Sequence, residues 1–178
     1  MTELTIKYST SPELDEPMVD IQVTYNDHSR SFRCLLDSGA DLITLPMSAS
    51  KDVYGINLEE MEDSFLKRIS DTLNAEIKTT ECICGHQLPS IQLPAQFQVI
   101  GSDYPKIWAM INWVKSDYGK EVMPVAGRKS FFSFFKVIIE ESKKEFTLVP
   151  NVDKIDESGI MIPESFRNLV GTLLLKAG

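Results

Sequence analysis

The sequence predicts an all-β fold with one short helix. Short runs of apolar or alternating residues recur along the chain, and turn-forming residues separate them. Several of these runs follow one another closely enough to form hairpins. Helical spacing is clearest in the phenylalanine-rich stretch 129–136, where Phe131, Phe134 and Phe135 fall on one face and are expected in the core.

The composition limits what this chain can be. Its 178 residues fit one domain at 1–150 followed by an extension at 151–178, which we expect to supply a dimer-interface strand or helix. A net charge of −8 without a basic cluster argues against nucleic acid or an anionic membrane as a partner. No apolar stretch is long enough to span a bilayer, and the three cysteines predict free thiols. We therefore expect a soluble, cytoplasmic protein.

The elements can be placed in chain order. Residues 46–65 are acidic and predict a turn or short helix, and 65–81 alternate weakly and predict a hairpin. Two prolines, Pro89 and Pro94, are expected at a strand edge or start. A short helix is expected at 163–170. Strands are expected at 4–8, 18–25, 31–36, 42–45, within 83–100, and at 106–114, 136–140, 145–149 and 172–176.

The chain is organised around the stretch 32–46. Apolar residues suited to buried strands flank Asp37-Ser38-Gly39-Ala40, which has the composition of a tight turn. A carboxylate between two buried strands is costly unless its environment uses the charge. The alternative is that Asp37 only caps an ordinary β-turn.

This stretch resembles the active-site turn of the retropepsin-like aspartic proteases, whose signature is Asp-Thr/Ser-Gly between hydrophobic residues. A second motif of that family is an apolar-apolar-Gly-Arg segment that opens a short helix, and Val125-Ala126-Gly127-Arg128 is similar to it. The resemblance covers roughly residues 18–149. It implies a closed β-barrel or sandwich with one short helix, forming one half of a two-fold aspartic protease without cofactor or metal.

The resemblance also implies a role for each matching residue. Asp37 corresponds to the catalytic carboxylate, and Ser38 and Gly39 complete the active-site turn. Asp41 corresponds to an acid that binds substrate main chain and pairs with Arg128, and we expect this pair to be partly buried. The expected substrate contacts are Gly39, Ala40, Asp41 and, at the tip of a flap hairpin over 65–81, Leu73 and Asn74.

The chemistry needs two carboxylates, and the chain has one such turn. The nearest second match, Asp156-Glu157-Ser158-Gly159, lacks the hydrophobic flanks. The resemblance therefore implies an aspartic endopeptidase that acts on peptides or proteins as a homodimer, with Asp37 of each copy at a two-fold axis. The alternative is an inactive dimerisation or peptide-binding module of the same fold.

Two other clusters have more than one interpretation. Asp41 and Arg128 could be unrelated surface charges. Cys82, Cys84 and His86 could suggest a metal site, but their spacing is not a usual zinc spacing, and we expect cysteines on a strand instead.

Overall fold

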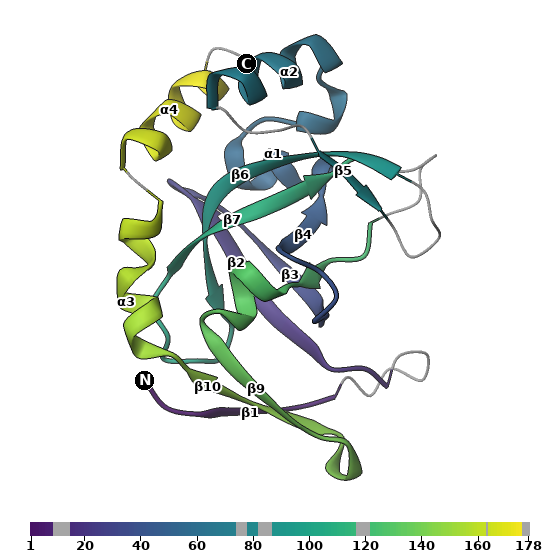
Figure 1. Ribbon diagram of the computed structural model, residues 1–178, viewed down its shortest axis with the longest axis vertical. Coiled ribbons are helices and arrows are strands. Elements are labelled where there is room, and N and C mark those ends of the chain that lie inside the picture. Colours follow the sequence, from purple (N-terminus) through teal and green to yellow (C-terminus); the bar gives the residue numbers. More distant parts are fainter. Residues whose placement is uncertain (9–14, 74–77, 82–86, 117–121, 163, 176–178) are drawn as a thin grey trace.

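The computed structural model describes residues 1–8, 15–73, 78–81, 87–116, 122–162 and 164–175 (Figure 1). The elements are β1 (Leu4–Lys7), β2 (Met18–Tyr25), β3 (His28–Leu36), β4 (Ile43–Pro46), η1 (Met47–Ala49), α1 (Ser50–Tyr54), η2 (Leu58–Glu60), α2 (Asp63–Leu73), β5 (Lys78–Glu81), β6 (Gln87–Val99), β7 (Ile107–Val114), β8 (Val125–Ala126), η3 (Arg128–Phe132), β9 (Phe135–Glu140), η4 (Glu141–Lys143), β10 (Glu145–Pro150), α3 (Val152–Met161) and α4 (Glu164–Leu175). The fold is therefore mostly β-sheet, as predicted. The structure has more helix than the one short helix of the predicted fold, and α4 covers most of the helix expected at 163–170.

The larger sheet closes on itself. Its strands follow the spatial order β2-β3-β8-β4-β7-β6-β5. Because β2 also pairs with β6, the six strands from β2 to β6 in this order form a closed ring. The predicted hairpin of β2 and β3 is confirmed. Val19, Ile21 and Val23 of β2 are fully buried, because a strand with one face toward the core buries every second residue. The closed ring encloses the core of the protein.

The two prolines of β6 lie where the strand can accept them. Pro94 falls between the segment of β6 that pairs with β5, which ends at Ser90, and the segment that pairs with β2, which begins at Gln96. A proline has no N–H to donate, so this interval without a second strand neighbour suits it. Pro89 lies in the short ladder with β5, opposite Thr79.

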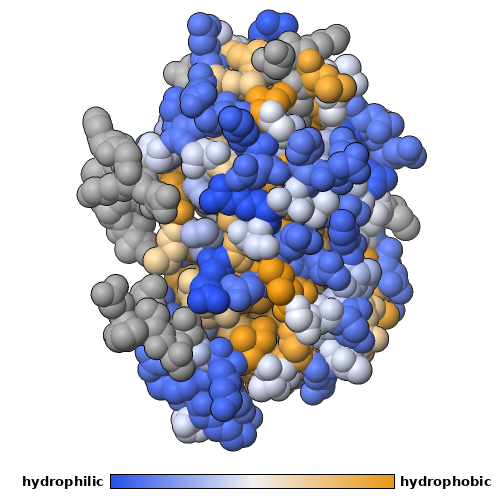
Figure 2. Space-filling model, turned by 180° about the vertical axis from the view of Figure 1, so that it is seen from behind, coloured by the Kyte–Doolittle hydropathy of each residue, from blue (hydrophilic) through white to orange (hydrophobic). Residues whose placement is uncertain are grey.

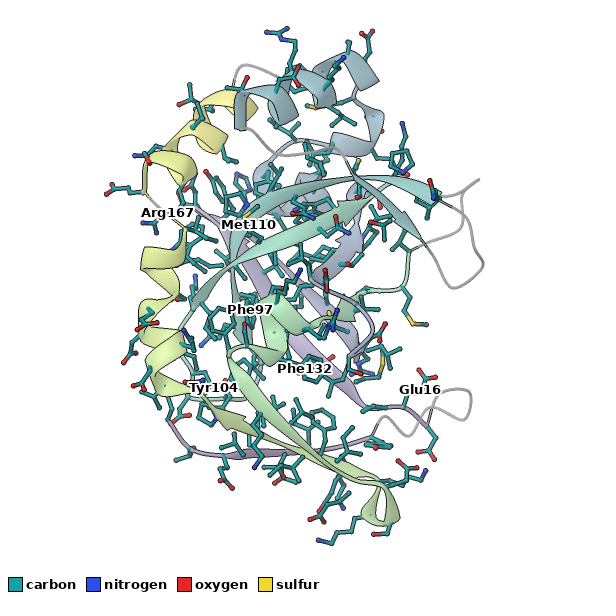
Figure 3. All side chains as sticks on the ribbon, viewed as in Figure 1. Glu16, Phe97, Tyr104, Met110, Phe132 and Arg167 are labelled. Carbon is teal, nitrogen blue, oxygen red and sulfur yellow. The ribbon has the colours of Figure 1, made fainter. Side chains whose placement is uncertain are left out.

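A smaller sheet with the order β1-β10-β9 lies below the barrel in the view of Figure 1. The predicted hairpin of β9 and β10 is confirmed. An aromatic cluster fills the space between this sheet and the barrel, where Phe97 and Tyr104 are labelled in Figure 3. The phenylalanines predicted for the core are buried in it, and the Phe131 and Phe135 rings are 5.0 Å apart.

The segment predicted as the flap hairpin is instead mostly helical. Residues 63–73 form α2, which lies beside α4 at one end of the molecule (Figure 1). The buried residues Leu66 and Ile69 are three positions apart, which is a helical spacing, and the weak alternation in this stretch was misleading. Leu73 ends the helix, and Asn74 lies outside the described residues.

The C-terminal extension forms two helices on the barrel of its own chain. Here α3 packs on β7, and Ile155, Ile162 and Val170 are buried. The Tyr25 hydroxyl donates to the Arg167 carbonyl oxygen at 2.7 Å. The Arg167 guanidinium lies 4.5 Å from the centre of the Trp108 ring. The strand predicted at 172–176 is wrong, because residues up to 175 are helical.

The surface is largely polar on the face seen from behind, with smaller hydrophobic areas between the polar residues (Figure 2). Within the part of the chain that the structure describes, no helix is both long enough and apolar enough to cross a membrane. The cytoplasmic location remains a prediction.

Candidate functional site

Asp37 lies in an open turn directly after a buried strand. Leu36, the last residue of β3, is buried, Asp37 is half-buried, and Ser38 and Gly39 are exposed. The Gly39 N–H donates to Asp37 Oδ1 at 2.7 Å, and the Ala40 N–H donates to the Asp37 carbonyl oxygen at 3.3 Å. The turn thus fixes one carboxylate oxygen while the residues around it face outward, which is an arrangement that a bound peptide could reach.

Backbone hydrogen bonds connect this turn to a segment nearly ninety residues further along the chain. β3 pairs in parallel with β8, and the Asp37 N–H donates to the Ala126 carbonyl oxygen at 3.2 Å. In return, the Arg128 N–H donates to the Ala40 carbonyl oxygen at 2.8 Å. The Lys129 N–H donates to the Asp41 carbonyl oxygen at 2.6 Å. The two predicted motifs therefore meet in the structure.

Gly127 is the point where the two segments cross. A Cβ atom at this position would lie 2.4 Å from the Leu42 carbonyl oxygen and 2.7 Å from the Ala40 carbonyl oxygen. Both atoms belong to the backbone of the loop that follows Asp37, so no rotamer change could relieve the contact. Gly127 has an ordinary φ of −98°, so the close approach of the backbones, rather than an unusual conformation, requires glycine here.

The sequence analysis missed Ser130, which holds β4 to the short π-helix η3. Its buried Oγ accepts a hydrogen bond from the Ile43 N–H. Satisfying a buried backbone donor in this way avoids a desolvation cost of about 1–3 kcal/mol. The available signal was weak, because Ser130 is one of two serines in a phenylalanine-rich stretch that was expected to be buried.

The predicted pair of Asp41 and Arg128 forms, but it is exposed. Arg128 Nη2 lies 2.7 Å from Asp41 Oδ1, and Lys129 Nζ, which was not predicted, lies 2.8 Å from Asp41 Oδ2. All three side chains are largely exposed: Arg128 at 59%, Asp41 at 51% and Lys129 at 70%. The expectation of a partly buried pair is wrong, because both motifs present these side chains on the outer side of the loop crossing.

The cations affect how Asp41 titrates. Hydrogen bonds from Lys129 first and Arg128 second hold the pKa of the Asp41 carboxyl below its ordinary value of 3.8. Because the folded-state pKa is lowered, any stabilisation from this group is present above pH 3.8 and is lost as the pH falls through the folded-state pKa. The exposure of all three side chains limits the size of this contribution.

We expect Lys129→Gln to raise the pKa of Asp41 toward 3.8, and to raise it more than Arg128→Gln does, because the Lys129 contact is the larger cause. Carboxyl chemical shifts followed by NMR across the acid range would measure this. Thermal unfolding of either variant at neutral pH should match that of the unmodified protein. Lys51→Gln, which removes an exposed lysine outside the contact, is the control. An equal pKa for Asp41 in all these proteins would contradict the prediction.

The structure contains a hairpin that overlaps the end of the predicted flap segment, because its first strand, β5, lies within residues 65–81. β5 pairs with Gln87–Ser90 of β6, and residues 82–86 between the two strands lie outside the described residues. Asn112 of β7 donates to Thr80 Oγ1 at 2.9 Å and, more weakly, to Thr44 Oγ1 at 3.5 Å. Asn112 is itself buried, so these bonds connect the hairpin through β7 to β4, the strand that follows the Asp37 turn.

Two hollows on the described surface lie away from Asp37. One, of about 510 Å³, lies between α4 and the barrel and is lined in part by Tyr25, Trp108 and Arg167. The other, of about 330 Å³, lies between β1 and β2. Asp37 lines neither of them.

No metal site is evident in the described part of the chain. Its residues contain no cluster of histidine, cysteine and carboxylate side chains that could hold an ion. Cys82, Cys84 and His86 lie outside the described residues. Cys34 is a buried free cysteine, and burial raises the pKa of its thiol, which leaves it protonated and poorly reactive.

Comparisons with models of protein families and with curated proteins give no match for this chain.

Proposed function

We propose that this chain is one half of a two-fold aspartic endopeptidase of the retropepsin-like type, completed by a second copy. The observation that carries the proposal is the crossing at Gly127, where the backbone has no room for a Cβ atom. This crossing brings the Gly-Arg segment against the Asp37 turn, which is the relation between the two motifs that the sequence resemblance implies. The closed ring of strands supports the same proposal.

The proposed reaction uses one Asp37 from each copy. Two carboxylates about 3 Å apart cannot both ionise easily, so the pair shares one proton. The ionised carboxylate removes a proton from water, whose oxygen attacks the carbonyl carbon of the peptide, while the protonated carboxyl gives its proton to the carbonyl oxygen. The resulting tetrahedral intermediate collapses, the C–N bond breaks, and the amine leaves with a proton.

We assign the flap to the hairpin of β5 and β6. Of the segment at 65–81 that the sequence suggested, residues 65–73 are helical, and only 78–81 belong to this hairpin, as β5. The hydrogen bonds of Asn112 to Thr80 and Thr44 support this assignment, because they couple the base of the hairpin to the strand after the Asp37 turn. On this assignment Leu73, the last residue of α2, does not belong to the flap.

The test is cleavage of denatured casein between pH 4 and 7, with and without a statine-type inhibitor, over a dilution series. Sedimentation over the same concentrations gives the dimer dissociation constant. We expect inhibitor-sensitive cleavage whose specific activity falls in proportion to concentration below that constant, because each chain supplies half of the dyad. Constant specific activity far below the dissociation constant would show that a monomer performs the chemistry.

One observation favours a second candidate function. Asp37 lines neither of the two hollows described above, which is compatible with a dimerisation or peptide-binding module that keeps the fold without catalysis. Such a module would form the dimer in the same dilution series but would cleave no casein at any concentration. The single experiment therefore separates the two candidates.

A further inference from the structure

One edge of the small sheet is open and apolar. β9 has β10 as its sheet neighbour and no strand on its other side among the described residues (Figure 1). Two of its residues are large and exposed, Ile138 at 39% and Ile139 at 53%. Natural edge strands are normally protected by charge, proline, a bulge or a covering segment, because an open apolar edge invites another strand.

The two isoleucines lie on opposite faces of the sheet. Ile139 is opposite Phe146 of β10, which is fully buried, so Ile139 continues a core-facing surface and yet remains half exposed. Ile138 lies on the other face, in line with Lys136 and Glu140, since side chains alternate along a strand. Whatever covers this edge must therefore provide apolar side chains on both faces.

The sequence of β9 is complementary to itself when it is reversed. Lys136 lies at one end, Glu140 at the other, and Val137, Ile138 and Ile139 lie between them. An antiparallel copy centred on Ile138 would bring Ile138 opposite itself, Val137 opposite Ile139, and Lys136 opposite Glu140. Every one of these pairs is apolar with apolar or positive with negative, and each is favourable between directly opposed residues.

We propose that β9 pairs antiparallel with β9 of a second copy of this chain across a two-fold axis at Ile138. The other edge strand of the small sheet, β1, has a similar reversed charge pattern when the preceding residue Glu3 is included, since a copy centred on Thr5 would place Glu3 opposite Lys7. Its apolar residues Leu4 and Ile6, however, are partly buried against the core. The exposed apolar side chains of Ile138 and Ile139 therefore favour β9 over β1 as the edge that joins two identical chains.

This pairing would provide an interface for the homodimer of the proposed function, and its role in catalysis rests on that proposal. β9 begins three residues after η3 ends, and η3 begins at Arg128, whose side chain and that of Lys129 hold Asp41. The proposed interface therefore lies on the strand that follows the Gly-Arg segment within a few residues. A two-fold axis at Ile138 would relate the Asp37 turn of one copy to that of the other.

The first test is disulfide cross-linking in a background where Cys82 and Cys84 are changed to serine, with Cys34 left buried. Ile138→Cys places one thiol of each copy at the axis, and oxidised glutathione then serves as the oxidant. We expect a covalent dimer from Ile138→Cys and none from Ile100→Cys, a control at another exposed isoleucine, 46% exposed, in the turn after β6. Equal cross-linking of the two variants, or none from Ile138→Cys, would overturn the pairing.

The second test exchanges the charges. Lys136→Glu places like charges opposite each other twice across the axis, and we expect the dimer dissociation constant to rise by about tenfold. Adding Glu140→Lys should restore most of the affinity, even though Glu140 also forms an ion pair with Lys143 in its own chain. Lys51→Glu, the same charge change at an exposed position of α1, should leave the dissociation constant unchanged. Failure of the double variant to regain affinity would overturn the register.

The outcomes separate this inference from the proposed function, because cross-linking needs no catalysis and can be measured in Asp37→Asn protein. A cross-linked dimer that cleaves nothing would keep the β9 interface and reject the protease. Inhibitor-sensitive cleavage by a protein that does not cross-link at Ile138 would keep the protease and reject the β9 interface.

Discussion

Asp37→Asn is expected to lower peptide cleavage by at least about a thousandfold, because it removes both the general base and the general acid of the proposed dyad. The fold should survive the change. The Gly39 N–H, now 2.7 Å from Asp37 Oδ1, can donate equally well to the amide oxygen of asparagine. Initial rates on denatured casein and a thermal melt of the same preparation measure the two effects.

Asp156→Asn is the matched control for this variant. Asp156 belongs to the second, imperfect match to the active-site tripeptide, and the structure places it exposed on helix α3. The change removes the same charge at a site without the strand flanks, so activity should remain at the level of the unmodified protein. Cleavage by purified Asp37→Asn at an undiminished rate would end the protease proposal.

The part of the fold that the sequence predicted well is the part that follows simple periodicity. More buried and more exposed side chains alternate along much of β2 and β3, because one face of each strand packs into the barrel while the other faces solvent. The meeting of Asp41 and Arg128 was expected from the motif resemblance, and the contact is present at 2.7 Å. Its exposure depends on where the crossing lies relative to the surface, which no local pattern encodes.

The remaining elements depend on contacts that are distant in sequence. The C-terminal residues Thr172 to Leu175 suit a strand or a helix equally by their apolar pattern. They are helical in a segment that packs against Tyr25 and Trp108, residues far away in the chain. Similarly, the base of the β5–β6 hairpin is connected to the site by Asn112, a single polar residue in an apolar strand whose partners could not be inferred without the sheet order.

Gly127→Ala is expected to have the largest effect on stability. The added methyl group would meet two backbone carbonyl oxygens, of Leu42 at 2.4 Å and Ala40 at 2.7 Å, where contacts below 3.0 Å essentially do not occur. To make room, the Asp37 turn and the Gly-Arg segment must separate, which also breaks the hydrogen bonds from the Asp37 N–H to the Ala126 carbonyl and from the Arg128 N–H to the Ala40 carbonyl. We expect the free energy of unfolding to fall by about 3 kcal/mol or more.

Gly159→Ala is the matched control, since it makes the same chemical change in helix α3 at a position where a Cβ would meet no atom within 4 Å. Alanine is the better helix former, so this variant should equal the unmodified protein or gain up to about 1 kcal/mol. Urea unfolding of both variants, followed by far-UV circular dichroism, gives the comparison. If Gly127→Ala unfolds at the same urea concentration as Gly159→Ala, the two segments do not cross as closely as the structure shows, and the observation that carries the proposed function is lost with them.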